Sequence, residues 1–216
     1  VTGLKNMTGI AVNDAPAAND LSTADTYTED MPAAFTAVVI TDIDSPSVTA
    51  TLTLSDPAVG TLSTAVIGSV TSTYDAAAGV WVASGALADV NALLASLTFT
   101  PAADYNGSFT IATSVDDGVA PAITGVKNMS GVPVDDAPTA TNLNAPQTYT
   151  EDTPLALTPI TVRDIDSSAV TVTLTLSDAA AGSLGTATAG SVTSAYDVTT
   201  GVWVASGAIS DVNTLL

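Results

Sequence analysis

Carboxylates carry most of the chemistry that this sequence offers, and they stand in short groups rather than evenly along the chain. With 22 acidic residues, three basic residues and no histidine, the chain has a formal charge of −19. Calcium binds about six to eight oxygen ligands, whereas magnesium prefers to keep its waters. The candidate ligands are Asn13, Asp14, Glu29, Asp30, Asp42, Asp44, Asp104, Asp116 and Asp117, followed by Asp135, Asp136, Asp164 and Asp166. These groups predict a calcium-binding protein.

The acidic groups return at a fixed distance, because the chain repeats itself with an offset of 122 residues. Residues 12–16 return as residues 134–138 with one change, and residues 79–85 return unchanged as residues 201–207. Aligning residues 1–94 on residues 123–216 needs no gap and leaves more than half of the positions identical. A unit of this length is a whole domain, since solenoid repeats run to about 20 to 50 residues.

We therefore expect three segments. Residues 1–16 are the end strand and linker of a preceding repeat, residues 17–138 form one complete repeat, and residues 139–216 form a second repeat that lacks its last strands. The equivalents of residues 95–122 are missing from the second copy. We expect the parent chain to continue and supply them. A neighbouring chain is the alternative source.

Short strand signals separated by turn residues dominate each copy. Residues 48–54 alternate between apolar residues and threonines, which indicates a sheet with one face in the core and one in water. The other predicted strands are residues 37–40, 69–74, 80–83, 97–100 and 108–113, and the one predicted helix is residues 89–95, capped by Asp89. This pattern predicts an all-β fold of tandem antiparallel β-sandwich repeats. We expect Trp81 and Trp203 as core anchors and Tyr105 as a tyrosine corner.

Alternating strand directions place the acidic groups at opposite ends of such a sandwich. Glu29, Asp30 and Asp104 fall at the downstream end of the first repeat, while residues 42–44 and 116–117 fall at its upstream end. The downstream group then meets the linker acids and the upstream group of the next repeat, so seven carboxylates converge on one junction. Two like charges about 4 Å apart cost roughly 4 kcal/mol at an effective dielectric near 20. We expect calcium to relieve this repulsion, with solvated turn formers as the alternative.

The charge and the composition exclude several classes of protein. So acidic a chain is repelled by nucleic acid and by an anionic membrane, and an apolar content of 46% is too high for a disordered acidic tail. Without cysteine there is no disulfide, thiolate zinc site or cysteine nucleophile. The sequence also has no Gly-x-Ser-x-Gly motif, and its paired carboxylates belong to domain ends, so we expect no enzyme.

Composition also bears on location. Abundant carboxylates and scarce lysines favour an extracellular or cell-surface protein that meets millimolar divalent ions. No apolar run in the sequence approaches the roughly 18 residues that a membrane span needs.

Four motifs together resemble a known family. They are the Val-Asn/Asp-Asp-Ala-Pro linker, the Tyr-Thr-Glu-Asp turn at residues 27–30, the Asp-Ile-Asp-Ser turn at residues 42–45, and the Tyr-x-Gly and Asp-Asp-Gly ending at residues 105–118. The chain resembles the cadherin-like and Ig-like tandem repeats of giant bacterial surface adhesins and biofilm matrix proteins. The resemblance implies calcium between repeats on Glu29, Asp135, Asp136, Asp164 and Asp166, with Asn13, Asp14, Asp42 and Asp44 at the preceding junction. The linker is shorter than in animal cadherins, and Asp104 stands in place of their Asp-Arg-Glu motif.

These observations support three functional hypotheses. The first is an extracellular structural array, stiffened by calcium into a rod or fibre, that acts in adhesion or in a biofilm matrix and contacts neighbouring repeats or further copies of itself. The second is a glycan-binding surface module, which needs an exposed aromatic platform built from Trp81, Tyr27, Tyr74, Tyr105 or their copies. The third is an accessory region of an enzyme. The threonine runs of residues 49–53 and 171–175 indicate the wet side of a sheet, with a glycan- or ice-binding face as the alternative.

Overall fold

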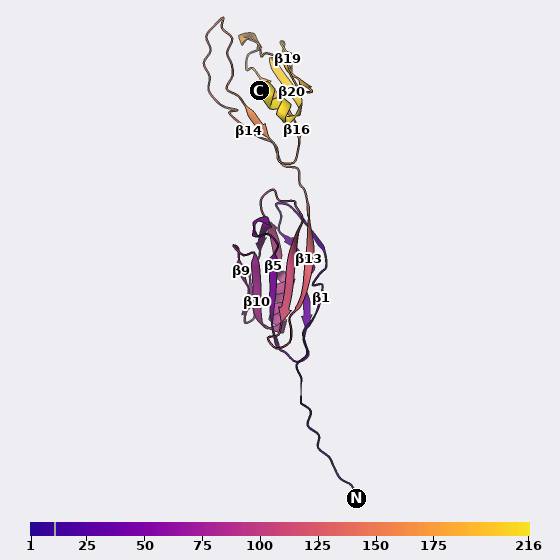
Figure 1. Ribbon diagram of the computed structural model, residues 1–216. Coiled ribbons are helices and arrows are strands. Elements are labelled where there is room, and N and C mark those ends of the chain that lie inside the picture. The colour runs from indigo at the N-terminus through magenta and orange to yellow at the C-terminus, as the bar shows by residue number, and fades with distance from the viewer. Residues whose placement is uncertain (11) are drawn as a thin grey trace. The chain divides into compact units, whose positions relative to one another are not determined.

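The computed structural model describes residues 1–10 and 12–216, and the chain divides into two compact units, Val1–Pro133 and Val134–Leu216. Strands make up most of the regular structure in each unit (Figure 1). The fold class is all-β, as the alternating pattern predicts. Among the described residues, no helix is long and apolar enough to cross a membrane.

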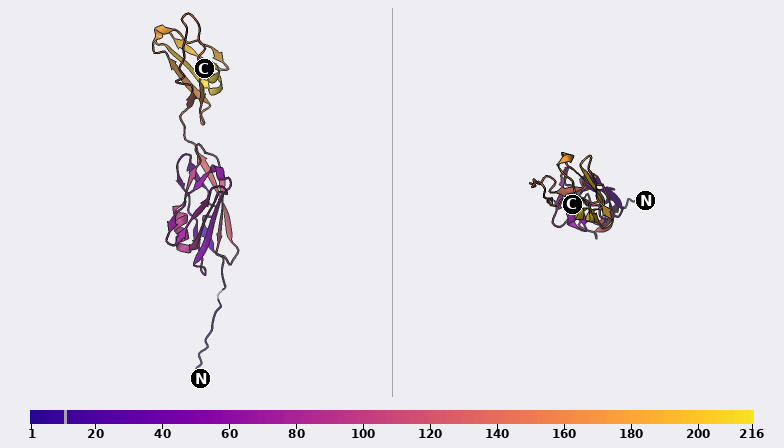
Figure 2. Two further views of the ribbon diagram at one scale, coloured as in Figure 1. Left: turned by 90° about the vertical axis from the view of Figure 1, so that its left-hand side faces the viewer. Right: turned by 90° about the horizontal axis from the view of Figure 1, so that it is seen from above.

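The first unit is built on a six-stranded sheet whose long strands lie side by side (Figures 1 and 2). Its spatial order is β2 (Asp25–Thr28), β13 (Ile123–Val132), β12 (Phe109–Asp116), β5 (Ser47–Leu54), β10 (Val80–Ala86) and β9 (Thr73–Asp75). Neighbouring strands in this sheet are antiparallel except β13 and β2, which are parallel. The parallel pair brings the start of the unit against its end, across about 100 residues of sequence.

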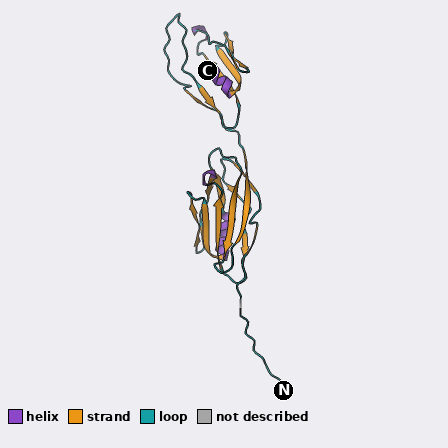
Figure 3. Ribbon diagram, viewed as in Figure 1, coloured by secondary structure: helices purple, strands orange, loops and turns teal. Residues whose placement is uncertain are grey.

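A second layer covers the inner face of this sheet. β11 (Thr98–Pro101) pairs with β3 (Ala33–Ala34) and β6 (Gly60–Leu62), and the helix α1 (Leu87–Ser96) packs beside β4, β5 and β10 (Figure 3). The remaining elements are β1 (Ala17–Asn19) paired with β4 (Val39–Thr41), β7 (Val66–Ile67) paired with β8 (Val70–Thr71), and the 3-10 turn η1 (Pro57–Val59). The two layers form the expected sandwich.

The core lies between the layers and includes Trp81 on β10, which is fully buried as expected. Its indole Nε1 donates to the Ser63 carbonyl at 3.0 Å, so the polar atom is satisfied. Phe99 contacts Tyr27 edge-on with ring centroids 5.1 Å apart, and lies 4.8 Å from the ring of Phe109. Each large apolar side chain of this kind contributes about 1.5 to 3 kcal/mol by leaving water.

Two local expectations differ from the structure. The helix begins at Leu87 with Ala86 at its N-cap, and Asp89 instead accepts hydrogen bonds from Ser69 N at 2.9 Å and Ser69 Oγ at 3.2 Å. Asp89 therefore ties the β7–β8 hairpin to the helix, because hairpin and helix meet there in space. The tyrosine that closes the downstream end is Tyr27, whose hydroxyl donates to the Gly107 carbonyl at 2.6 Å. Tyr105 Oη instead lies 3.5 Å from the Ser108 carbonyl oxygen.

A buried ion pair joins β13 to β2. Lys127 is almost fully buried, and its Nζ lies 3.3 Å from Asp25 Oδ2 and 3.3 Å from the Thr23 carbonyl. The inward positions of β13 also hold Gly125 and Gly131, so this strand lacks a strong alternating apolar pattern. It is recognised from sequence only through its copy at the start of the chain. Residues 1–10, which carry that copy, form no strand among the described residues and are exposed throughout.

The second unit repeats the central part of the first. Its strands are β14 (Thr139–Thr141), β15 (Thr161–Arg163), β16 (Ala169–Thr175), β17 (Thr188–Ala189), β18 (Val192–Thr193), β19 (Ala195–Asp197) and β20 (Val202–Ala208), with the helix α2 (Ile209–Leu215) and the 3-10 turn η2 (Ala179–Ala181). β16, β20 and β19 form a sheet that matches β5, β10 and β9. Trp203 is buried in its core as expected, and its Nε1 donates to the Gly185 carbonyl at 3.0 Å.

Candidate metal centre

The Asp-Ile-Asp-Ser turn after β4 organises the upstream end of the first unit. Asp42 Oδ1 accepts the backbone N–H groups of Asp44 at 3.0 Å and Ser45 at 2.7 Å, which closes the turn. Asp44 Oδ2 in turn accepts the backbone N–H of Asp14 at 2.9 Å. The second oxygen of Asp42 is buried and has no hydrogen-bond partner among the described residues. A buried carboxylate oxygen without a donor is costly unless something cationic meets it.

Asn13 and Asp117 join this end from opposite parts of the sequence. Asn13 Nδ2 donates to Asp117 Oδ2 at 2.7 Å, while Ser45 Oγ lies 3.2 Å from Asn13 Oδ1. The hydrogen bond from Asn13 holds the pKa of Asp117 below its usual range, and the N–H groups of Val119 and Ala120 add to this effect. Asp117 therefore stays ionised well into the acidic range.

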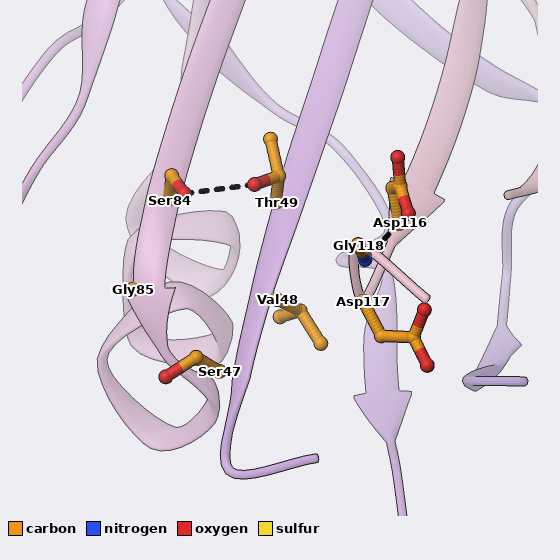
Figure 4. A pocket seen from close by; sticks show the side chains of 8 residues that line it. All are labelled: Ser47, Val48, Thr49, Ser84, Gly85, Asp116, Asp117 and Gly118. Atoms are coloured by element: carbon orange, nitrogen blue, oxygen red, sulfur yellow. Dashed lines mark hydrogen bonds between the residues drawn. The ribbon is translucent and has the colours of Figure 1, made fainter. Parts of the chain in front are cut away.

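Asp116 belongs to the same hairpin but is directed elsewhere. Its Oδ1 accepts the Gly118 N–H at 2.7 Å, and it pairs with Thr49 across the sheet. Figure 4 shows the carboxylates of Asp116 and Asp117 pointing apart, near the hydrogen-bonded pair of Thr49 and Ser84. Of the expected upstream ligands, the structure thus joins Asn13, Asp14, Asp42, Asp44 and Asp117 by hydrogen bonds and leaves Asp116 on the sheet face.

The downstream end of the first unit gathers Glu29, Asp30 and Asp104. Glu29 is buried, its N–H donates to the Val132 carbonyl at 3.2 Å, and its Oε1 lies 3.4 Å from Asn106 Nδ2. Asp30 Oδ1 accepts the Asp104 N–H at 3.1 Å. The expected grouping of these three acids is therefore present within this unit.

Two of the three downstream acids have an unusual backbone conformation. Asp30 and Asp104 adopt φ values of 60° and 58°, a left-handed conformation that costs most residues about 1 to 2 kcal/mol but that Asp and Asn tolerate better. Strain of this kind gathers at functional sites. The turn that carries Asp104 is fixed by Tyr27, and burial raises the pKa of that tyrosine to about 12, with Tyr105 and Glu29 adding to the effect.

The second unit forms its own upstream end with the same bonds. Asp164 Oδ1 accepts the N–H groups of Asp166 at 3.1 Å and Ser167 at 2.7 Å. Asp166 Oδ2 accepts the Asp136 N–H at 2.8 Å, and Ser167 Oγ lies 3.4 Å from Asp135 Oδ1. The hydrogen bonds around Asp42, Asp44 and Asp14 are thus reproduced 122 residues later.

Sequence reasoning missed three polar neighbours of these acids. Ser45 and Ser167 bond to the linker residue of their own unit, and Asn106 reaches Glu29. The signal for the serines was available, because a serine directly follows the Asp-Ile-Asp turn in both copies. Asn106 lay two residues from Asp104, in the turn already assigned to the downstream end.

In the first unit the aromatic side chains that a glycan platform would need are largely inside, whereas Tyr149 in the second unit is exposed. Tyr27 and Trp81 are buried, Tyr74 and Tyr105 are half-buried, and all four belong to or pack against the core of the first unit. Clusters of carboxylate and amide oxygens at the domain ends are the more distinctive chemistry. They could hold a hard cation.

Comparison with known proteins gives a likeness of fold. No protein-family model matches the chain, and no curated protein sequence matches it. Among solved structures, the chain is similar to protocadherin gamma B2 extracellular cadherin domains 1–5, at 16% identity and a TM-score of 0.40, over 91% of this chain and 33% of that one. It is also similar to the tandem Ig repeats of Dlar, at 14% identity and a TM-score of 0.29, over 59% of this chain and 54% of that one.

A third similar structure is the type II cohesin dyad of the ScaA scaffoldin from Acetivibrio cellulolyticus, at 12% identity and a TM-score of 0.27, over 85% of this chain and 74% of that one. The chain spans about a third of the length of the protocadherin fragment that it matches. The similar structures thus include cadherin, Ig and cohesin domains.

Proposed function

We propose that this chain is part of an extracellular array of β-sandwich repeats that calcium stiffens into a rod or fibre, and that the array acts in adhesion or in a matrix such as a bacterial biofilm. One observation carries the proposal. The N–H of the linker aspartate donates to the second aspartate of the Asp-Ile-Asp turn in both copies, Asp14 to Asp44 and Asp136 to Asp166. Because the same hydrogen bond fixes the linker in both copies, the linker aspartate has the same position relative to the Asp-Ile-Asp turn in both.

The upstream group would supply one side of each calcium site. The first unit offers hard oxygen donors of the kind that calcium takes. They are Asp42 Oδ2, the carboxylates of Asp44 and Asp117, and the side-chain carbonyl of Asn13. In the second unit, Asp164, Asp166, Asp135 and Asp136 would do the same. Asp116 contributes least, because it faces the sheet and holds its own turn.

The downstream group would supply the other side. Glu29, Asp30 and Asp104 end one repeat, and the linker acids that follow begin the next. Without a cation, these carboxylates repel one another and favour separated repeats. Calcium would replace that repulsion with attraction and restrict the angle between consecutive repeats, so a flexible string becomes a rod.

The proposal is tested by calorimetric titration of the 216-residue chain with calcium, followed by small-angle scattering in calcium and in chelator. We expect binding in the range of about 10⁻⁴ to 10⁻³ M, typical of extracellular sites, and a longer, narrower distribution of sizes when calcium is bound. Asp166→Asn should weaken binding. The matched control is Asp20→Asn, because Asp20 lies outside both groups and its equivalent in the second copy is already Asn142, with φ of 60° against 61°.

No heat of binding, together with identical scattering in calcium and chelator, would reduce these acids to solvated turn formers. Glycan binding would then be the next hypothesis to test. Equal loss of affinity in Asp166→Asn and Asp20→Asn would show that the ion responds to net charge and not to this group.

A further inference from the structure

The outer face of the six-stranded sheet stands apart from the rest of the first unit in its charge. We use "outer face" for the side chains of β2, β13, β12, β5, β10 and β9 that point away from the core. The unit has 13 acidic and two basic residues, a net charge of −11. In the described sheet only Asp75 and Asp116 bring charge to the outer face, and each lies at a strand end where it accepts N–H groups of its own turn.

The centre of the outer face is made of small uncharged side chains. One row across the strands reads Val82, Thr51 and Ser114, and the next reads Val80, Thr53 and Ala112. On β13, the row continues with Val126, which is 48% exposed. Methyl groups and hydroxyls alternate over a regular sheet, with no long side chain standing above it.

Some of the hydroxyls are already satisfied within the face. Thr49 Oγ1 and Ser84 Oγ lie 2.7 Å apart across β5 and β10. Their copies, Thr171 Oγ1 and Ser206 Oγ, are also 2.7 Å apart in the second unit. A hydroxyl that already has a partner costs little to remove from water. The face can therefore be covered at a smaller cost than its polar content suggests.

The two copies of the repeat keep this face while other exposed strands change. The outward residues of β5 and β10 return on β16 and β20 with one change, from Ser47 to Ala169, and Thr171, Thr173 and Thr175 pair with Ser206, Val204 and Val202. Exposed positions on β4 do not return, since Val39 becomes Thr161 and Thr41 becomes Arg163. The part of the uncharged face that β5 and β10 form is thus present in both repeats.

We propose that the outer face docks a second copy of this chain, sheet against sheet. Two molecules of such negative charge repel one another on most approaches, and a contact elsewhere would trap carboxylates against carboxylates. The centre of the outer face allows contact without burying a charge, since Asp75 and Asp116 lie at strand ends, and its Val, Ala and Thr methyl groups gain by leaving water. A glycan is a poorer fit, because ligand sites are concave and rich in aromatic residues, whereas this face is regular and the aromatic rings of the unit point inward.

The size of the face sets the strength that is expected. Strands about 4.8 Å apart and about 3.3 Å per residue give six strands a projected area of roughly 600 Å². Specific interfaces bury about 800 Å² on each partner, so one repeat alone associates weakly. Several repeats in line would add their contributions through effective concentration. Lateral association of whole arrays is the consequence.

The absence of cysteine from the sequence makes a direct test possible. Thr51→Cys places one thiol at the centre of the outer face, and the control Thr61→Cys places one on the exposed side of β6 in the other layer. A bis-maleimide that spans about 10 Å matches the spacing of two packed sheets. We expect cross-linked dimers of Thr51→Cys to form several-fold faster than those of Thr61→Cys, and faster still in higher salt, which screens the repulsion.

A second variant keeps the test decisive. Adding Val82→Glu to Thr51→Cys puts facing carboxylates on both copies, and should reduce the rate to that of the control while circular dichroism shows an unchanged fold. The rates are compared in calcium and in chelator, because docking through this face does not depend on the calcium sites. Equal rates for Thr51→Cys and Thr61→Cys in both conditions would overturn the proposal. So would binding of a bacterial polysaccharide that Val82→Glu abolishes while the cross-linking rate is unchanged, since the face would then be a glycan platform.

Discussion

The two copies of the repeat share most of their sequence, but they differ in how far the Tyr-Thr-Glu-Asp segment of each is buried. Tyr27 on β2 is 2% exposed, whereas its equivalent Tyr149 is 72% exposed. Residues 25–28 form β2 because β13 pairs with them, while no strand forms at residues 147–150. The same Tyr-Thr-Glu-Asp sequence is thus a buried strand end in one unit and an exposed turn in the other. Strand formation here is decided by partners distant in sequence and not by local preference.

The upstream and downstream acidic groups also differ in whether they form in both units. The linker and Asp-Ile-Asp part of the upstream group forms in both units, because its hydrogen bonds join residues about 30 positions apart, such as Asp14 with Asp44 and Asp136 with Asp166. Asp117 is the exception, since it joins Asn13 across 104 residues in the first unit. The downstream group of the first unit needs Asp104 and Asn106, which are more than 70 residues from Asp30 and Glu29. Glu151, the equivalent of Glu29, is exposed. The linker and turn part of the upstream group is therefore local in sequence, whereas the downstream group depends on strands far away in the chain.

The largest effect is expected from removing a core tryptophan. Trp81→Ala should cost about 3 to 5 kcal/mol of unfolding free energy, as large-to-small core substitutions do. Trp203→Ala should cost less, because fewer buried side chains surround it. Hydrogen exchange of β5 and β16, read by mass spectrometry, measures each unit separately, and the remaining tryptophan reports on the unit left intact. Equal losses in the two variants would contradict the idea that the first core is the more complete one.

The buried ion pair gives the next largest effect. Asp25→Asn leaves Lys127 inside the sheet without its counter-ion, and the expected loss is about 2 to 3 kcal/mol, below the range for fully buried pairs because Asp25 is 11% exposed. Urea unfolding measures it. Asp20→Asn is the control, since it removes one exposed negative charge and should change stability by less than about 0.5 kcal/mol. The second copy carries Gln147 at this position, so it lacks the carboxylate of this ion pair.

The same pair predicts a dependence on pH. Burial raises the pKa of Asp25, but hydrogen bonds from the Thr36 N–H and hydroxyl and the charge of Lys127 outweigh it, so the folded pKa lies below the usual range. A depressed folded pKa contributes stability above the unfolded value of about 3.9, and this contribution is lost as pH falls through the folded value. The difference in unfolding free energy between the parent chain and Asp25→Asn should therefore shrink below pH 4. A constant difference down to pH 2 would assign the effect to packing.

Particular residues show how far the sequence could predict this molecule. The alternation in residues 48–54 and the buried Trp81 are short-range signals, and the all-β sandwich followed from them. The exchange of roles between Tyr27 and Tyr105 did not follow, because both stand beside the same turn and only the packed structure decides which hydroxyl reaches Gly107. The grouping of acids at each end followed from strand direction. The contact of Asn106 with Glu29 did not, because it joins residues 77 positions apart. The serines were predictable from their place directly after the Asp-Ile-Asp turn, but that signal was not used.

A fourth prediction tests whether displacing β13 makes the first turn of the first unit as exposed as its copy in the second unit. A Cβ at Gly131 would lie 2.3 Å from the Asn106 carbonyl oxygen, so Gly131→Val should push β13 away from the turn that carries Asp104. Overpacking of this kind costs about 1 to 3 kcal/mol. Hydrogen exchange at residues 25–29 should rise toward that of residues 147–151. Gly9→Val is the matched control, because Gly9 is the repeat equivalent and has no atom within 4 Å of its added Cβ; its stability should not change.

The smallest effect separates backbone strain from a single hydrogen bond. Asp30 and Asp152 are equivalent, with φ of 60° and 59°, so alanine at either position loses the tolerance of aspartate for the left-handed conformation. Only Asp30 also accepts the Asp104 N–H, a bond worth about 0.5 to 1.5 kcal/mol. Asp30→Ala should therefore destabilise its unit by about 1 kcal/mol more than Asp152→Ala destabilises the other, as measured by hydrogen exchange in chelator. Glycine at position 30 should recover the conformational part and leave the hydrogen-bond part missing, whereas full recovery by glycine would mean that the Asp30–Asp104 bond does not stabilise the downstream end.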